Sequence, residues 1–124
     1  MQQKVQEIRY RKSSNSLLVT FADGASFALP AEYLRVFSPS AEVRGHGLQE
    51  PLLVIGKEQV RIRAIEPVGR YAVKLVFDDG HDSGLYDWDI LRKLAEEQEH
   101  NWTGYLARLR NAGVPHPSET DGHG

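Results

Sequence analysis

The stretch YAVKLVFDDGHDSGLYDWDILRKL, residues 71–94, decides the fold. Every second residue at its start has a large apolar side chain, namely Tyr71, Val73, Leu75 and Phe77. This alternation is typical of a strand that packs one face on a core. Asp79-Gly80 predicts a two-residue hairpin turn, because glycine accepts the positive φ that such turns require. Asp87 is expected to cap a helix that begins near Trp88. The stretch therefore predicts a strand, a tight turn, a second strand and a helix.

The same order of elements occurs earlier in the chain. LLVTFADGASFALPAEYLR, residues 17–35, can be laid on VKLVFDDGHDSGLYDWDILR, residues 73–92, with one extra residue placed in the second helix. The identical or matching positions are Phe21 with Phe77, Asp23 with Asp79, Gly24 with Gly80, and Leu29 with Leu85. Two interpretations remain open: an internal duplication, or two hairpins that need the same turn and strand residues. Both predict an α+β fold of two ββα-like units that form a small antiparallel sheet core with C-terminal helices. If the units pack by pseudo-symmetry, Ala25 and His81 occupy equivalent places.

The remaining elements follow from similar patterns. Val5 to Arg11 and Val60 to Ile65 are predicted strands. Asn101 is expected to cap a C-terminal helix whose apolar stripe is formed by Trp102, Tyr105, Leu106 and Leu109. The last ten residues, PHPSETDGHG, contain no large apolar side chain. We therefore predict one domain over residues 1–113 and a disordered tail over 114–124.

Composition limits the function classes. The chain has 124 residues and no cysteine, which excludes disulfides, thiolate nucleophiles and cysteine-bound zinc or iron–sulfur centres. Residues 1–63 carry nine Lys and Arg against six Asp and Glu, and residues 64–124 carry six against eleven. Neither half is basic enough for a nucleic-acid footprint. We see no signal peptide and no apolar run of membrane-spanning length, so we expect a cytoplasmic protein without a membrane partner.

The ionisable residues at the second turn are the main candidate site. His81 lies among Asp78, Asp79 and Asp82, a mixture of imidazole and carboxylates that suits zinc or ferrous iron. The structural alternative is favoured, because acids are common in turns and adjacent strand residues point to opposite faces. His46, in the long loop over residues 36–59, is the best second partner for His81 if that loop folds over the hairpin.

Other motifs do not indicate catalysis. Arg44-Gly45-His46-Gly47 lacks the lysine and the strand-to-helix context of a phosphate-binding loop. Ser38 and Ser40 have no G-x-S-x-G context that would activate a nucleophile. His100, His116 and His123 receive no site role. We therefore expect a protein that is not an enzyme.

Both the long loop and the hairpin resemble a known family. LPAEYLRVFSPSAEVRGHG, residues 29–47, and IEPVGRYAVKLVFDDGHDSGLYDWDILRKL, residues 65–94, look like the domain of unknown function DUF971, also called the gamma-butyrobetaine hydroxylase-like N-terminal domain. The resemblance covers roughly residues 5–110. It implies that a related domain precedes an iron- and 2-oxoglutarate-dependent dioxygenase, and that other relatives attach it to iron–sulfur cluster carrier ATPases.

The resemblance also implies that relatives have a metal site that this chain has lost. Relatives hold a structural zinc through three cysteines and one histidine, whose positions match Ser38, Ser40, Val43 and His81 here. Hydroxyl and isopropyl groups do not replace thiolates, so the chain looks like the stand-alone bacterial members without the zinc cysteines.

We accordingly predict a non-enzymatic module for protein or small-ligand contact, with no cofactor. Its interaction face would include Arg44, His46, Asp78, Asp79 and Asp82. Its partner would be an iron–sulfur carrier or a dioxygenase-type protein. The alternatives are weak zinc or iron binding through His81, and an accessory role in iron–sulfur cluster assembly.

Overall fold

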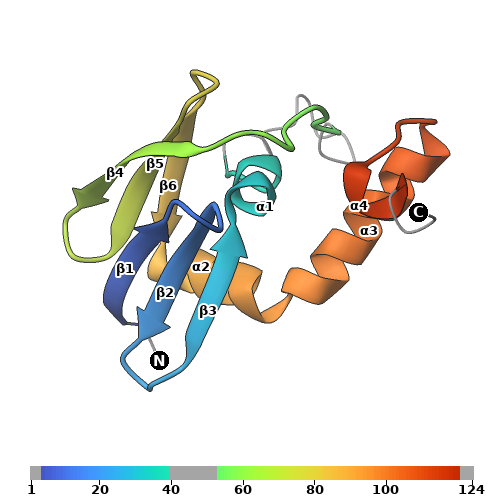
Figure 1. Cartoon of the computed structure of the whole chain (residues 1–124). Helices are drawn as coiled ribbons and strands as arrows, with labels where there is room; N and C mark the ends of the chain where they lie inside the picture. The colour runs from blue at the N-terminus through green and yellow to red at the C-terminus, as the bar shows by residue number, and fades with distance from the viewer. Residues whose placement is uncertain (1–3, 40–52, 121–124) are drawn as a thin grey trace, which may run out of the picture.

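The structure is a computed structural model that describes residues 4–39 and 53–120, with the backbone alone at 82–84 and 119–120. Six strands and four helices follow one another over these ranges (Figure 1). They are β1 (Val5–Arg11), β2 (Ser16–Phe21), β3 (Ser26–Pro30), α1 (Ala31–Val36), β4 (Ile62–Val68), β5 (Ala72–Phe77), β6 (Asp82–Asp87), α2 (Trp88–Glu96), α3 (Gln98–Asn111) and α4 (Pro117–Thr120).

The elements form two copies of one unit. Strands β1, β2 and β3 make one antiparallel sheet, and β4, β5 and β6 make another with the same order. A helix follows each sheet directly, and its first amide donates to the carbonyl that precedes the central strand, Ala31 to Asn15 at 2.9 Å and Trp88 to Tyr71 at 3.0 Å. The predicted α+β class is confirmed. Each unit has three strands rather than two, because β1 and β4 both pair with the hairpin that follows them.

The hairpin turns differ from the prediction in their length. Phe77 N donates to His81 O at 3.1 Å, so three residues separate the paired ends, where the sequence predicted a two-residue turn. Gly80 N donates back to Phe77 O at 3.1 Å, and Gly80 has a φ of 88°. This geometry is a three-residue loop that ends in a left-handed glycine. Phe21 and Ala25 are joined in the same way around Gly24, at 2.8 Å, which makes Ala25 and His81 structural equivalents.

The extra residue of the second unit lies in β6 and not in its helix. The register of β6 against β5 shifts between the Val76–Asp82 pair and the Lys74–Leu85 pair, which marks a bulge. Strand β3 has no such shift against β2. A bulge absorbs an inserted residue and turns the following side chains to the other face. Leu29 is therefore equivalent to the buried Tyr86, and the predicted match to Leu85 was wrong, since Leu85 is 41% exposed.

The larger of two apolar clusters lies between the two sheets and the first two helices. Its fully buried members come from both units and include Leu17, Phe21, Leu29, Tyr33, Leu34, Leu75, Phe77, Tyr86 and Leu91. The two buried tyrosines have partners for their hydroxyls, because Tyr33 donates to Leu94 O and Tyr86 donates to Leu34 O, each at 2.6 Å. These bonds cross between the units and fix how they pack.

The C-terminal helices follow the predicted apolar stripes, with one difference at a cap. Asp87 caps α2 as predicted and accepts from Ile90 N at 2.8 Å. Asn101 does not cap α3, which begins at Gln98. It lies inside the helix and donates to Tyr33 Oη at 3.0 Å. The partner for this amide comes from α1, which local sequence does not reveal.

Part of the segment predicted as a tail packs against α3. Residues 114–120 follow α3 back along the molecule and include the short helix α4 (Figure 1). His116 is 5% exposed and packs edge-on against Trp102, with ring centroids 5.5 Å apart. Residues 121–124 lie outside the described ranges. Within those ranges we find no helix with the length and apolarity needed to span a membrane.

Candidate functional site

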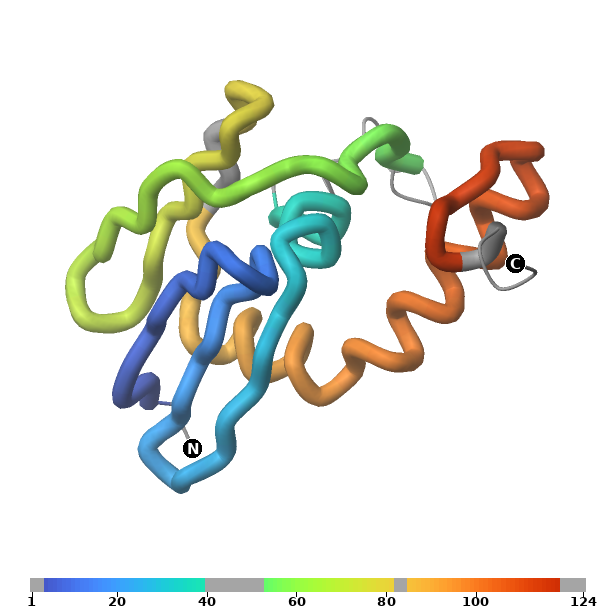
Figure 2. Tube along the Cα trace, viewed as in Figure 1, coloured from blue at the N-terminus to red at the C-terminus, as the bar shows by residue number. Residues whose placement is uncertain are grey.

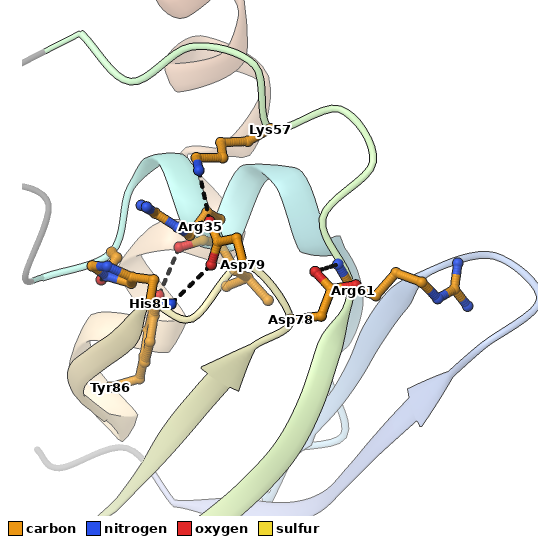
Figure 3. A network of polar contacts seen from close by, with 9 residues as sticks. Arg35, Lys57, Arg61, Asp78, Asp79, His81 and Tyr86 are labelled. Carbon is orange, nitrogen blue, oxygen red and sulfur yellow. Dashed lines mark hydrogen bonds and ion pairs between the residues drawn. The ribbon is translucent and has the colours of Figure 1, made fainter.

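Asp79 is the centre of a polar network at the second turn (Figure 3). Its Oδ2 atom is 2.9 Å from Arg35 Nε and 2.7 Å from Lys57 Nζ. Its Oδ1 atom accepts from the amide of His81 at 2.9 Å. The Asp79 side chain keeps only 19% of its surface exposed. Two cations and one amide therefore hold the turn in a single arrangement against α1 and the segment before β4.

These contacts determine the ionisation of Asp79. Burial by itself raises the pKa of the carboxyl group, but hydrogen bonds from Lys57, the His81 amide and Arg35 outweigh burial. The pKa of Asp79 is consequently held well below its ordinary value of 3.8. The carboxylate is charged at neutral pH and neutralises the cations beside it.

Arg35 and Asp79 have a counterpart in the first unit. Arg92, at the equivalent place in α2, is 3.2 Å from Asp23 Oδ2 in the turn between β2 and β3. The arginine of each unit thus reaches the turn aspartate of the other unit. Arg92 also lies over the rings of Phe21 and Phe27, at 5.0 and 5.5 Å from their centroids. Both ion pairs therefore join the two repeats across the interface between them.

His81 is held by a residue that lies 43 positions earlier. Its Nε2 atom is 3.3 Å from Ser38 Oγ, and its ring lies 6.3 Å from that of Phe77. Ser38 is fully buried in the turn that ends α1, whereas the His81 ring is half-buried. The structure therefore brings together two of the four positions at which the resemblance placed zinc ligands.

The other predicted site residues are not gathered around His81 in the described part of the chain. Asp78 turns toward β4 and accepts from Arg61 N at 3.0 Å (Figure 3). Residues Ser40, Val43, Arg44 and His46, and the side chain of Asp82, lie outside the described residues. Among the described side chains, His81 does not belong to any group of three metal-ligating residues. Metal binding at His81 stays a prediction.

Two residues of this network were missed by sequence reasoning. Arg35 carried a usable signal, because it matches Arg92 at the end of both aligned copies. Lys57 carried none, since it lies in an irregular segment between the units. Figure 2 shows why it is close: residues 53–61 run over α1 toward β4 and pass the second turn. Only the packing of that segment brings the Lys57 ammonium to Asp79.

Residues 8–92 match the model of the family described as gamma-butyrobetaine hydroxylase-like, N-terminal. The matched range includes both repeats, the connecting segment and the His81 turn. The chain belongs to this family. The predicted resemblance is therefore confirmed, and the paired turns of this gamma-butyrobetaine hydroxylase-like domain are part of the region that the family shares. No curated protein matches the chain.

Three solved structures are similar to the chain, and the third is of a protein of the same family. A protein solved by NMR is 53% identical over 91% of this chain and 84% of its own length, with a TM-score of 0.78. A second NMR structure is 47% identical over 92% of this chain and 90% of its own, with a TM-score of 0.79. A crystal structure of a DUF971-family protein of unknown function from Acidithiobacillus ferrooxidans is 39% identical over 74% of this chain and 92% of its own, with a TM-score of 0.62.

Proposed function

We propose that this gamma-butyrobetaine hydroxylase-like domain is a non-enzymatic contact module of the cytoplasm. Its contact face is the His81 turn together with the end of α1. The observation that carries the proposal is the 3.3 Å contact of the half-buried His81 with the buried Ser38, whose two chain neighbours line a hollow in the surface. A preformed surface of this kind binds without a large ordering cost.

The hollow begins at the two neighbours of Ser38. It has a volume of about 320 Å³ and is lined by Phe37, Pro39, Ile90, Lys93, Leu94, Glu97 and Asn101. Its apolar residues are buried or half-buried, whereas Lys93 and Glu97 are exposed at its rim. This combination of apolar area and a few polar groups suits an apolar side chain of a partner protein whose flanking residues are charged.

The family supports a protein partner over a free small molecule. Its description, gamma-butyrobetaine hydroxylase-like, N-terminal, names the domain by its place at the N-terminus of other proteins, which favours contact with another protein segment. We propose a dioxygenase-type protein or an iron–sulfur carrier as the partner class. In this proposal the domain holds such a protein through the face defined above.

Site-specific cross-linking in cells tests the proposal. A photo-reactive amino acid replaces Lys93, an exposed residue at the rim of the hollow. The control carries the same group at Ser26, an exposed residue next to the first turn. We expect a discrete protein adduct from position 93, absent from position 26 and reduced when His81→Ala is added. Adducts of equal yield from both positions, or none from position 93, would refute the proposed face.

A second candidate function is weak binding of zinc or iron through His81. The 3.3 Å approach of Ser38 Oγ to His81 Nε2 favours it, because the two positions still meet as ligand positions would. Zinc titration followed by NMR distinguishes this candidate from the first. Saturable shifts at His81 that disappear in His81→Ala would support it, and unchanged His81 resonances would exclude it.

A further inference from the structure

A second group of ionisable side chains lies at the opposite end of α1. Glu32 belongs to α1, Glu58 to the segment before β4, and His116 to the segment after α3. One ligand atom from each residue lies within 4.8 Å of the other two. The His116 side chain is 6% exposed and that of Glu32 is 14% exposed. Three separate parts of the chain thus bring two carboxylates and one imidazole to a single point away from His81.

The His116 ring is held in one orientation. Ser118 N donates to Nδ1 at 3.1 Å, and Ser118 Oγ lies 2.9 Å from the same atom. Because a backbone amide only donates, Nδ1 accepts, and the ring proton is on Nε2. Nε2 then donates to Glu32 Oε2 at 2.8 Å. The ring orientation therefore directs Nε2 toward the Glu32 carboxylate in the absence of a metal.

The surroundings favour a cation at this point. The Glu32 and Glu58 carboxylates meet at one point beside the buried His116 ring, and the Glu32 side chain is only 14% exposed. Two acidic groups in a partly desolvated place repel each other. A divalent ion between them would remove that repulsion.

We propose that Glu32, Glu58 and His116 bind a divalent transition-metal ion, with water completing its coordination. Two carboxylate oxygens and one imidazole nitrogen suit Zn²⁺, Mn²⁺ and Fe²⁺ better than Mg²⁺ or Ca²⁺, which prefer oxygen ligands alone. The site is distinct from the family's cysteine and histidine positions and is independent of the contact function proposed above. Failure of either proposal leaves the other unaffected.

Binding requires a defined proton shift. The metal takes the lone pair of Nε2, the proton on Nε2 leaves to solvent, and Nδ1 takes up a proton from solvent. The new Nδ1–H donates to Ser118 Oγ, while the Ser118 amide turns away. A metal-bound histidine commonly holds its second ring N–H in such a bond. The bound ion would tie the C-terminal segment to α1 and to residues 53–61.

Titration of the full chain with Zn²⁺ alone tests the site. Long-range ¹H–¹⁵N NMR spectra report the tautomer of each histidine ring. We expect His116 to change from the Nε2–H to the Nδ1–H form as zinc saturates, and the midpoint of thermal unfolding to rise with zinc concentration. Mn²⁺ should broaden the resonances of the residues around His116.

Two variants separate this site from others. Glu58→Gln removes one ligand but leaves the Glu32–His116 bond, so it should fold normally and bind zinc at least about tenfold more weakly. His81→Ala is the matched control and should bind zinc at His116 as the wild type does. The proposal is overturned if zinc leaves the His116 tautomer unchanged, if the shifts occur only at other histidines, or if Glu58→Gln binds as tightly as the wild type. In the first case the Glu32–His116 hydrogen bond has a structural role only.

Discussion

The two turns share a backbone but differ in what surrounds them. Asp23 and Asp79 each accept from the amide two residues later, at 3.0 and 2.9 Å, and each meets an arginine of the other repeat. Asp23, however, keeps 58% of its side chain exposed, while Asp79 keeps 19% and gains Lys57 as a second cation. The added partners of the second turn come from the long connection between the repeats. Contacts with that connection distinguish the second turn, which is the candidate site, from the first turn.

The largest expected effect comes from restoring the cysteines that relatives carry. The triple variant Ser38→Cys, Ser40→Cys and Val43→Cys should bind zinc together with His81, with a binding free energy on the order of 10 kcal/mol. Thiolate ligands supply the affinity that hydroxyls lack. Cobalt substitution should give the absorption spectrum of a tetrahedral site.

A transposed histidine provides the control for this comparison. In the same triple variant, His81→Ala with Ala25→His moves the imidazole to the equivalent place in the first turn. The tetrahedral spectrum should disappear, because Ser38 lies against position 81 of the second turn. A spectrum that survives the move would show that the two turns are interchangeable and that the structural difference has no chemical consequence.

The two phenylalanines that precede the turns should contribute similarly to the stability of the fold. Phe21 and Phe77 are 1% and 0% exposed and occupy equivalent places in the common core. Replacement of either by alanine should lower the free energy of unfolding by about 3 to 5 kcal/mol, because a large cavity is left. Urea unfolding measures both values. If the loss of unfolding free energy at one position is less than half the loss at the other, the two repeats do not contribute equally to the core.

The two turn aspartates should contribute differently to the stability of the fold. Asp79→Asn should lower the free energy of unfolding at pH 7 by about 1 to 2 kcal/mol, because two cations lose their partner. Asp23→Asn should cost clearly less, since Asp23 is largely exposed. Chemical unfolding of the two variants and the wild type gives the comparison directly.

The Asp79 effect should depend on pH with a defined sign. The pKa of Asp79 is lowered by folding, so its charge stabilises the folded state above the ordinary pKa of 3.8. The difference between wild type and Asp79→Asn should shrink as the pH falls below about 4. A difference that stays constant from pH 7 to pH 3 would mean that the ion pairs do not stabilise the fold.

The smallest effect should occur at the bulge. Leu85→Ser should change the free energy of unfolding by no more than about 0.5 kcal/mol, because Leu85 faces solvent. Tyr86→Phe should cost about 1 kcal/mol through the lost bond to Leu34 O. Equal unfolding midpoints for Leu85→Ser and Leu29→Ala would instead support the alignment that pairs these two leucines. The extra residue of the second unit would then not lie in β6.

Local sequence was sufficient for the elements themselves. Alternating apolar residues identified β2 and β5, Asp87 identified the start of α2, and the apolar stripe of α3 identified its buried face. The resemblance between the two aligned stretches also predicted that Ala25 and His81 are equivalent. These features depend on neighbours within a few residues, which the chain order already contains.

Tertiary structure alone decided what the second turn and the C-terminal segment become. The bulge in β6 follows from the pairing of β6 with β5, and it moves Tyr86 rather than Leu85 into the core. The contacts of Lys57 with Asp79, Ser38 with His81, and Glu32 with His116 join residues that are 22, 43 and 84 positions apart. Sequence patterns describe periodicity along the chain, whereas these contacts depend on how separate segments pack against one another. For that reason the sequence drew attention to His81, whereas the grouping of His116 with Glu32 is visible only in the tertiary structure.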